Sequence, residues 1–223
     1  NFLEKNPHTV SVMVEPIQGE GGIIIPDDNY LRDMRQLCDE YNVLMIADEV
    51  QTGLGRTGKM LACNHYNVRP DILCLGKALS GGFYPISAVL SNETIMSVLT
   101  PGTHGSTFGG NPLASAIGIE AINVIQRQKL SRNAEKLGRF FREHLIANTQ
   151  SKHVKSIHGI GLLNAIDFHS QEKADEFVEK LIDNYIFTKT TRETTVRITP
   201  PLVISHKEMT ILVNRIKKVL NEL

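Results

Sequence analysis

Lys77 and Asp48 are the two side chains whose setting best suits catalysis. Lys77 lies in the segment GKALSGG, directly after the apolar run 71–75, and Asp48 follows a second apolar run, 43–47. If both runs are parallel strands, the ammonium and the carboxylate meet at the same sheet edge. A lysine there can form a Schiff base with an aldehyde, and an aspartate can keep a pyridine nitrogen protonated so that the ring withdraws electrons. This pairing is typical of an enzyme that uses pyridoxal 5′-phosphate.

The elements that must position these residues follow from hydrophobic periodicity. Short apolar runs predict strands at residues 10–14, 43–47, 72–75 and 87–90. Between the first two, apolar residues recur at helical spacing up to Asn42, with Asp27 or Asp28 available as the cap. Alternation of strand, helix and strand predicts a right-handed crossover and therefore an α/β fold with a mostly parallel sheet.

The pattern changes from Pro112, where a long helix with proline in its first turn leads out of the first domain. We expect residues 1–127 to be the carboxyl-terminal part of a large domain and residues 128–223 to be a small α/β domain with antiparallel strands. Its expected elements are a helix through Asn148, strands around Gly159 and Gly161, a helix over 172–184, short strands near Ile186 and Val196, and a last helix to about Leu220 that opens with the capping box Ser205–Glu208.

Composition narrows the class of protein. The chain has 223 residues, 41% of them hydrophobic, and its 24 basic residues balance 24 acidic ones, so no net charge recruits nucleic acid or an anionic membrane. Three cysteines without metal-ligand spacing indicate reduced thiols in an intracellular protein. No apolar stretch approaches the roughly 20 residues of a membrane helix, which predicts a soluble protein. The chain begins without methionine and its first strand starts at once, which indicates that an amino-terminal part is missing.

Four ordered glycine-rich blocks carry a resemblance to a known family. They are EPIQGEGG (15–22), DEVQTGLGRTGK (48–59), PDILCLGKALSGG (70–82) and HGSTFGGNPLA (104–114). The chain resembles the subgroup III, fold-type I pyridoxal phosphate aminotransferases, and within them most closely the branch that acts on ornithine. Matching segments extend from Val10 to the last helix. The resemblance implies an aspartate aminotransferase-like fold.

The resemblance also implies roles for individual residues. Lys77 resembles the Schiff-base lysine and Asp48 the partner of the pyridinium nitrogen. Val50 resembles a residue that packs on the cofactor ring, and Gln51 one that hydrogen-bonds its phenolic oxygen. The last pair, Ser106 and Thr107, resembles residues that reach the cofactor phosphate of the neighbouring subunit, so the family likeness implies a homodimer with a shared active site, possibly within a higher oligomer.

Glu20 and Arg197 carry the expectation about substrate. In the ornithine branch, a glutamate like Glu20 pairs with an arginine like Arg197 and then moves away, so that the arginine binds the carboxylate of the second substrate. A guanidinium suits this task because it holds a carboxylate with two parallel hydrogen bonds. The implied reaction transfers the δ-amino group of L-ornithine to 2-oxoglutarate. Its products are glutamate and glutamate 5-semialdehyde, which cyclises to pyrroline-5-carboxylate, within arginine metabolism and proline biosynthesis.

Several alternatives stay open at this stage. Relatives that use N-acetylornithine or 4-aminobutyrate share the cofactor residues. The segment 53–59 satisfies the P-loop pattern G-x-x-x-x-G-K, although Met60 stands where serine or threonine should bind magnesium. A third alternative is a non-catalytic fragment or a related protein with an interaction role.

Four further expectations concern metal ions, loop charges, partners and the cellular compartment. The eight histidines show no metal spacing, so no metal site is expected. Arg56 and Lys59 are interpreted as solvated loop charges, with a contribution to a positive potential near the site as the alternative. The substrates are small molecules, and no nucleic acid or membrane partner is expected. The expected compartment is the cytoplasm, with the mitochondrial matrix as the alternative.

Overall fold

The computed structural model describes residues 2–223, which form two units. The first unit contains residues up to Pro16 together with Pro26–Leu54 and Met60–Gln128. The second contains Lys129–Leu223 and two short segments from earlier in the chain, Ile17–Ile25 and Gly55–Lys59. The assignment of residues 1–127 and 128–223 to a large and a small domain of a whole enzyme stays a prediction.

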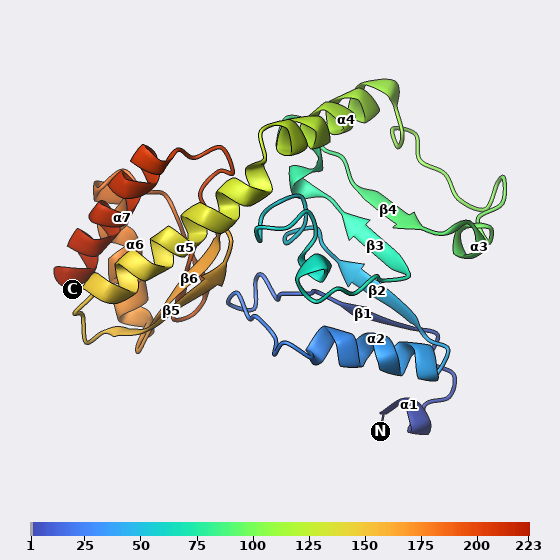
Figure 1. Cartoon of the computed structure of the whole chain (residues 1–223), viewed down its shortest axis with the longest axis horizontal. Coiled ribbons are helices and arrows are strands. Elements are labelled where there is room, and N and C mark those ends of the chain that lie inside the picture. Colours follow the sequence, from blue (N-terminus) through green and yellow to red (C-terminus); the bar gives the residue numbers. More distant parts are fainter. Residues whose placement is uncertain (1) are drawn as a thin grey trace. The chain divides into compact units, whose positions relative to one another are not determined.

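The first unit is built on a four-stranded sheet in the order β1-β2-β3-β4 (Figure 1). Pairing is parallel from β1 to β2 and from β2 to β3, whereas β4 runs antiparallel to β3. The strands are β1 (Ser11–Val14), β2 (Leu44–Asp48), β3 (Ile72–Leu75) and β4 (Ala88–Ser91). All four expected strands are confirmed to within one residue at most ends, and the sheet is mostly parallel.

Helix α2 (Tyr30–Glu40) is the crossover between β1 and β2, and it buries Leu31 and Cys38. These side chains belong to a cluster with Val43 and Met45 at the start of β2. The expected cap was wrong, because Asn29 is the N-cap residue and makes no side-chain cap bond. Asp27 contributes its main-chain carbonyl instead, which accepts a hydrogen bond from Tyr30 N at 3.0 Å.

Helix α4 (Pro112–Arg127) begins as expected, with proline in the first turn and Asn111 accepting a hydrogen bond from Ala114 N at 2.9 Å. The apolar residues of this helix are only partly buried: Leu113 and Ile119 remain 59% and 62% exposed. The remaining short elements of this unit are α1 (Phe2–Lys5), α3 (Glu93–Met96) and the 3₁₀ turns η1 (Ala62–His65) and η2 (Lys77–Ser80).

The second unit contains a four-stranded antiparallel sheet in the order β5-β6-β8-β7 and three helices. Its elements are α5 (Leu130–Asn148), β5 (Val154–Ile160), β6 (Leu163–Phe168), α6 (Gln171–Asp183), β7 (Thr190–Arg192), β8 (Thr195–Ile198) and α7 (His206–Asn221). The expected strand near Ile186 was wrong. Tyr185 has a positive φ of 59°, and Ile186 N donates to Leu181 O, so this segment closes the end of α6 instead of pairing with the sheet.

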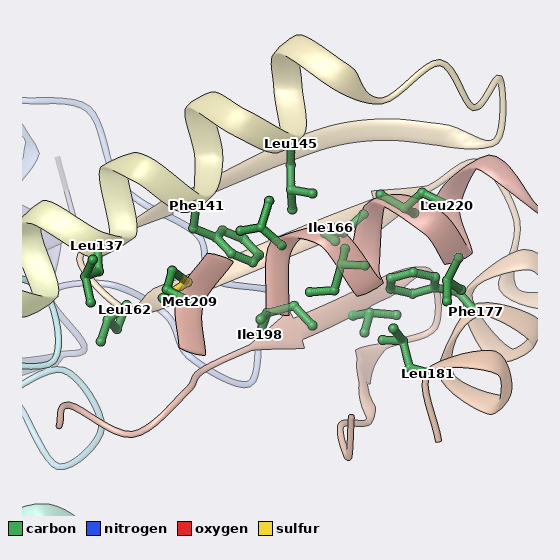
Figure 2. Close-up of a cluster of buried hydrophobic side chains, with 14 of the residues drawn as sticks. Leu137, Phe141, Leu145, Leu162, Ile166, Phe177, Leu181, Ile198, Met209 and Leu220 are labelled. Carbon is green, nitrogen blue, oxygen red and sulfur yellow. The ribbon is translucent and has the colours of Figure 1, made fainter. Parts of the chain in front are cut away.

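The three helices pack on the sheet through fully or nearly fully buried side chains. Figure 2 shows this core; its labelled members are Leu137, Phe141, Leu145, Leu162, Ile166, Phe177, Leu181, Ile198, Met209 and Leu220. Burying a side chain of this size stabilises the fold by roughly 1.5–3 kcal/mol. The expected capping box of α7 is confirmed, since Ser205 and Glu208 each accept a hydrogen bond from the other's main-chain N–H.

The turn between β5 and β6 requires glycine. Gly161 has a positive φ of 56°, and a Cβ built on Gly138 of α5 would lie 1.7 Å from its carbonyl oxygen. Helix α5 therefore approaches the turn as closely as main-chain atoms allow. Within residues 2–223, no helix has the length and apolar character to cross a membrane.

Candidate active site

The carboxylate and the amine that the sequence singled out leave adjacent parallel strands. Asp48 is the last residue of β2 and is paired with Cys74 on β3, three residues before Lys77. Val50 N donates a hydrogen bond of 2.9 Å to Asp48 Oδ1, which fixes the carboxylate at the strand end. Asp48 and Lys77 thus lie at the carboxyl ends of neighbouring strands, where α/β sheets bind ligands.

The main chain around Lys77 is held in an unusual conformation. Lys77 has a φ of 43°, in the left-handed region that costs a non-glycine residue free energy and that concentrates at functional sites. A Cβ on the preceding Gly76 would lie 3.3 Å from Val50 Cγ1, so Val50 packs directly against the chain that carries the lysine. A cavity of about 430 Å³ adjoins Lys77 and is lined by Tyr84, Pro85, Ile86 and Ser87.

Gln51 and Glu49 flank the same strand end. Gln51 is partly buried beside Val50, whereas Glu49 is 1% exposed. The Glu49 carboxylate accepts hydrogen bonds from Thr52 Oγ1 at 2.6 Å and from the main-chain N–H groups of Ala62 and Cys63, both at 2.8 Å. Sequence reasoning gave Glu49 no role of its own. Its only signal was an acidic residue next to Asp48.

The P-loop alternative does not agree with this geometry. A phosphate-binding loop of that type must open a helix whose N-terminus faces the phosphates. Residues 50–61 instead form a series of turns, followed by η1, which has four residues. The segment 53–59 is therefore not a nucleotide-binding loop.

Ser106 and Thr107 lie in an exposed loop of the first unit. Ser106 Oγ accepts a hydrogen bond from Gly109 N at 2.9 Å, so it caps a turn within its own loop. Neither residue lines the cavity beside Lys77.

Glu20 and Arg197 are brought together, within the second unit. Arg197 Nη1 lies 2.5 Å from Glu20 Oε1, and Lys189 Nζ lies 3.8 Å from the other carboxylate oxygen. The side chain of Arg197, on β8, is 18% exposed, whereas that of Glu20 is 60% exposed. The arginine is therefore the anchored partner and the glutamate the one with room to move. Arg197 also lines a cavity of about 520 Å³ together with Phe187, Thr188, Lys189, Thr199 and Pro200.

Arg56 is not the solvated loop charge that we expected. Its Nη1 donates hydrogen bonds to Pro200 O at 2.6 Å and to Leu162 O at 3.1 Å. Burial, and next the positive charge of Arg197, lower the pKa of Arg56 to about 10. The sequence gave no sign of this, because both acceptors are main-chain carbonyls more than 100 residues away. Lys59 is exposed, as expected.

Residues 2–223 hold no cluster of three histidine, cysteine or acidic side chains that could bind a metal ion. Cys38 and Cys63 are buried and Cys74 is partly buried, all as free thiols. Burial, reinforced by the nearby Glu49 carboxylate, raises the pKa of the Cys63 thiol, which keeps it protonated.

A mostly parallel sheet with a lysine and an aspartate at its carboxyl edge, joined to an antiparallel α/β unit, is the architecture of a fold-type I pyridoxal phosphate transferase. The family model for class-III aminotransferases matches residues 2–220, and the chain belongs to that family.

Within this family, the chain is similar to several ornithine aminotransferases. The chain is 53% identical over 92% of its length to the ornithine aminotransferase of Plasmodium yoelii yoelii and 48% identical over 99% to that of Oceanobacillus iheyensis, covering 50% and 55% of those proteins. The crystal structure of the ornithine aminotransferase of Toxoplasma gondii ME49 superposes with a TM-score of 0.96 at 48% identity, over 98% of this chain and 52% of that one. The resemblance to the ornithine branch is confirmed, and the chain spans about half the length of the curated relatives it matches.

Proposed function

We propose that the chain is part of an aminotransferase that uses pyridoxal 5′-phosphate to transfer the δ-amino group of L-ornithine to 2-oxoglutarate, giving glutamate 5-semialdehyde and glutamate. The observation that carries this proposal is the ion pair between Glu20 and Arg197. A partly buried guanidinium covered by an exposed carboxylate suits an enzyme that must accept one substrate without a second carboxylate and another with one. The similarity to several ornithine aminotransferases supports the same substrate.

The residues at the edge of the first sheet fit the cofactor. Asp48 Oδ1 accepts a hydrogen bond from Val50 N, and the other carboxylate oxygen would accept one from the protonated ring nitrogen. The Val50 side chain packs against Gly76, next to Lys77, so a flat ring would find an apolar surface beside the amine. A different protein of this family, the ornithine aminotransferase of Toxoplasma gondii, has been crystallised with pyridoxal phosphate at partial occupancy in its active site.

When bound, pyridoxal 5′-phosphate would supply an aldehyde that condenses with amines and a ring that withdraws electrons from the reacting carbon. Lys77 would hold the aldehyde until substrate arrives, and its Nζ would then move the proton from the carbon that bears the substrate's amine. Asp48 would keep the ring nitrogen protonated. Val50 would orient the ring, and Gln51 would donate to its phenolic oxygen.

Substrate exchange would depend on the second unit. With ornithine, Glu20 would neutralise Arg197 and leave the site suited to an amine. With 2-oxoglutarate, Glu20 would move away and Arg197 would bind the distal carboxylate. The exposed fractions of 60% for Glu20 and 18% for Arg197 support this division, because the more exposed side chain is the one that must move.

N-acetylornithine is a second candidate donor. The acetylornithine aminotransferase of Elizabethkingia anophelis superposes with a TM-score of 0.94 at 46% identity, over 100% of this chain and 59% of that one. That value is close to the ones for the ornithine enzymes, so the cofactor chemistry is supported more firmly than the donor.

We further propose that the whole enzyme is a homodimer in which Ser106 and Thr107 contact the cofactor phosphate of the neighbouring subunit. Both side chains are exposed in this chain, as such a role requires. We place the enzyme in the cytoplasm. A relative from Drosophila melanogaster is named as mitochondrial, so the matrix is the alternative compartment.

The test combines covalent trapping with a donor panel. Borohydride reduction of the full-length enzyme with its cofactor, followed by peptide mapping, should locate the label on Lys77, and Lys77→Ala should abolish both label and turnover. Ornithine should exceed N-acetylornithine and 4-aminobutyrate in kcat/KM. A label on another residue would refute the cofactor assignment, and a preference for N-acetylornithine would refute the ornithine assignment alone.

A further inference from the structure

Arg56 lies in the loop after β2 and is hydrogen-bonded to the segment that follows β8, the strand that carries Arg197, and to the residue just before the neighbouring strand β6. Its guanidinium donates to Pro200 O, three residues beyond Arg197, and to Leu162 O, immediately before β6. Strand β6 is the hydrogen-bonded neighbour of β8, with Ala165 opposite Arg197. One guanidinium therefore holds the end of β8 and the beginning of its partner strand.

The main chain of Arg56 strengthens this connection. Arg56 O accepts a hydrogen bond from Leu162 N at 3.0 Å. A Cβ on Gly161 would lie 2.6 Å from Arg56 O and 2.3 Å from Thr57 C, so the two segments touch through main-chain atoms. Both the main chain and the side chain of Arg56 are therefore held by hydrogen bonds, which fixes the position of its charge.

The charges around Arg197 are unequal in number. Glu20 is the carboxylate that faces Arg197, and it is also the one within reach of Lys189. Within residues 2–223, the side-chain partners of Arg56 are carbonyl oxygens, not carboxylates, so its charge is not neutralised locally. The lowered pKa of Arg56 has burial as its main cause and the charge of Arg197 as the next, which means that the two guanidinium groups interact.

We propose that Arg56 is a positioning and specificity-determining residue: it holds the main chain that follows Arg197, and its charge makes the Arg197 site favour a second carboxylate on the amino acceptor. This inference rests on the proposed function, because it assigns Arg197 to the acceptor's distal carboxylate. Arg197 and Lys189 share the Glu20 carboxylate, and Arg56 adds a positive charge that no carboxylate of residues 2–223 pairs with. When Glu20 moves away, a dicarboxylate supplies the missing negative charge. A monocarboxylic acceptor gains nothing from Arg56.

The experiment measures the two half-reactions of the full-length enzyme with its cofactor by rapid mixing. Arg56→Gln removes the charge and keeps one amide donor, whereas Arg56→Lys keeps the charge and loses the guanidinium whose Nη1 donates to both carbonyls. For Arg56→Gln, the half-saturating concentration of 2-oxoglutarate should rise about tenfold, while the values for ornithine and for the monocarboxylic acceptor pyruvate stay within about 1.5-fold. Lys59→Gln, which removes an exposed cation from the same loop, should change none of the three.

An equal loss with all three substrates, or no loss with 2-oxoglutarate, overturns the inference, because a merely structural residue does not discriminate between acceptors. If Arg56→Gln does not fold, Arg56→Lys decides: a rise of about threefold that is confined to 2-oxoglutarate supports the inference, and a uniform change overturns it. Arg197→Lys is measured in parallel. Loss of dicarboxylate preference in Arg197→Lys but not in the Arg56 variants refutes this inference alone, whereas retained preference in Arg197→Lys refutes the proposed role of Arg197 itself.

Discussion

Two adjacent carboxylates at the end of β2 have opposite surroundings. Glu49 is buried and receives three hydrogen bonds, from Thr52, Ala62 and Cys63, which tie the following loop to the strand. Asp48 is held by Val50 N and lies at the sheet edge, where α/β proteins bind ligands. The first carboxylate therefore shapes the loop, and the second has the position for chemistry.

Replacing Glu49 by glutamine should destabilise the fold although the two side chains have the same shape. The amide NH₂ would face at least one of the donors that now point at a carboxylate oxygen, and an unsatisfied buried N–H costs about 1–3 kcal/mol. Urea unfolding of the Glu49→Gln variant measures this loss. The exposed Glu40→Gln on α2 is the matched control and should stay within about 0.5 kcal/mol; equal stabilities of the two variants would contradict the assignment.

Removing Glu20 should change donor choice. In Glu20→Ala the Arg197 guanidinium loses its carboxylate partner at 2.5 Å, so donors with a second carboxylate, such as glutamate, gain access. We expect the ratio of kcat/KM for glutamate to that for ornithine to rise about tenfold or more. Glu193→Ala, which removes an exposed carboxylate in the turn between β7 and β8, serves as control. An unchanged ratio in Glu20→Ala would exclude the switch.

The sequence predicted which residues might act but not how each is held. Asp48 and Lys77 could be placed at neighbouring strand ends in advance, because apolar runs predict where strands end. Arg56 and Glu49 could not be interpreted in this way, since their partners are main-chain groups of segments that the fold brings close. Every residue has a main-chain carbonyl, so the sequence does not show which residue supplies the acceptor. For Ser106 the sequence allowed two interpretations, because a serine in such a loop can cap the following segment or reach a phosphate, and in this chain its hydroxyl caps a turn of its own loop.

At the scale of elements, the strands and long helices followed from periodicity, and the errors lie where local geometry decides. The apolar residue Ile186 was assigned to a strand, but its N–H bonds to Leu181 O at the end of α6. The cap of α2 was placed on an aspartate, whereas the chain turns through the Asp27 carbonyl. The apolar pattern of α4 was clear, yet the pattern alone cannot say that Leu113 and Ile119 stay exposed.

Helix α6 should make part of its stability depend on pH. Hydrogen bonds from Lys173 and then Lys180 lower the pKa of Glu176 from 4.5 to about 2. Because the folded pKa lies below the unfolded one, the stabilisation is present above pH 4.5 and is lost as the pH falls towards 2. Glu176→Gln should therefore lower the urea midpoint at pH 6, and its difference from the parent should shrink across that window. Glu179→Gln, at an exposed position of the same helix, is the matched control. A difference for Glu176→Gln that does not vary with pH would contradict the ion-pair cause.

At the scale of the whole molecule, the residues that we propose for the ring and the amine of the cofactor lie in a chain that spans only 50% of the Plasmodium yoelii yoelii enzyme and 55% of the Oceanobacillus iheyensis enzyme. The hydroxyls of Ser106 and Thr107 are proposed to serve a neighbouring subunit. Cofactor binding by this chain alone should therefore retain the contacts of Asp48 and Lys77 and lack contacts that the remaining half and the dimer would supply.

This expectation can be measured as thermal stabilisation by pyridoxal 5′-phosphate. At a cofactor concentration about 100 times the Kd of the full-length enzyme, binding stabilises that enzyme by about 2.7 kcal/mol, and a chain that binds tenfold more weakly gains only about 1.4 kcal/mol. We expect the 223-residue chain to show the smaller gain and little turnover, and its Lys77→Ala variant to show less gain still. Equal stabilisation and equal kcat for the chain and its full-length parent would mean that this half of the sequence is a sufficient enzyme, since no contact from outside it would then be needed to hold the cofactor.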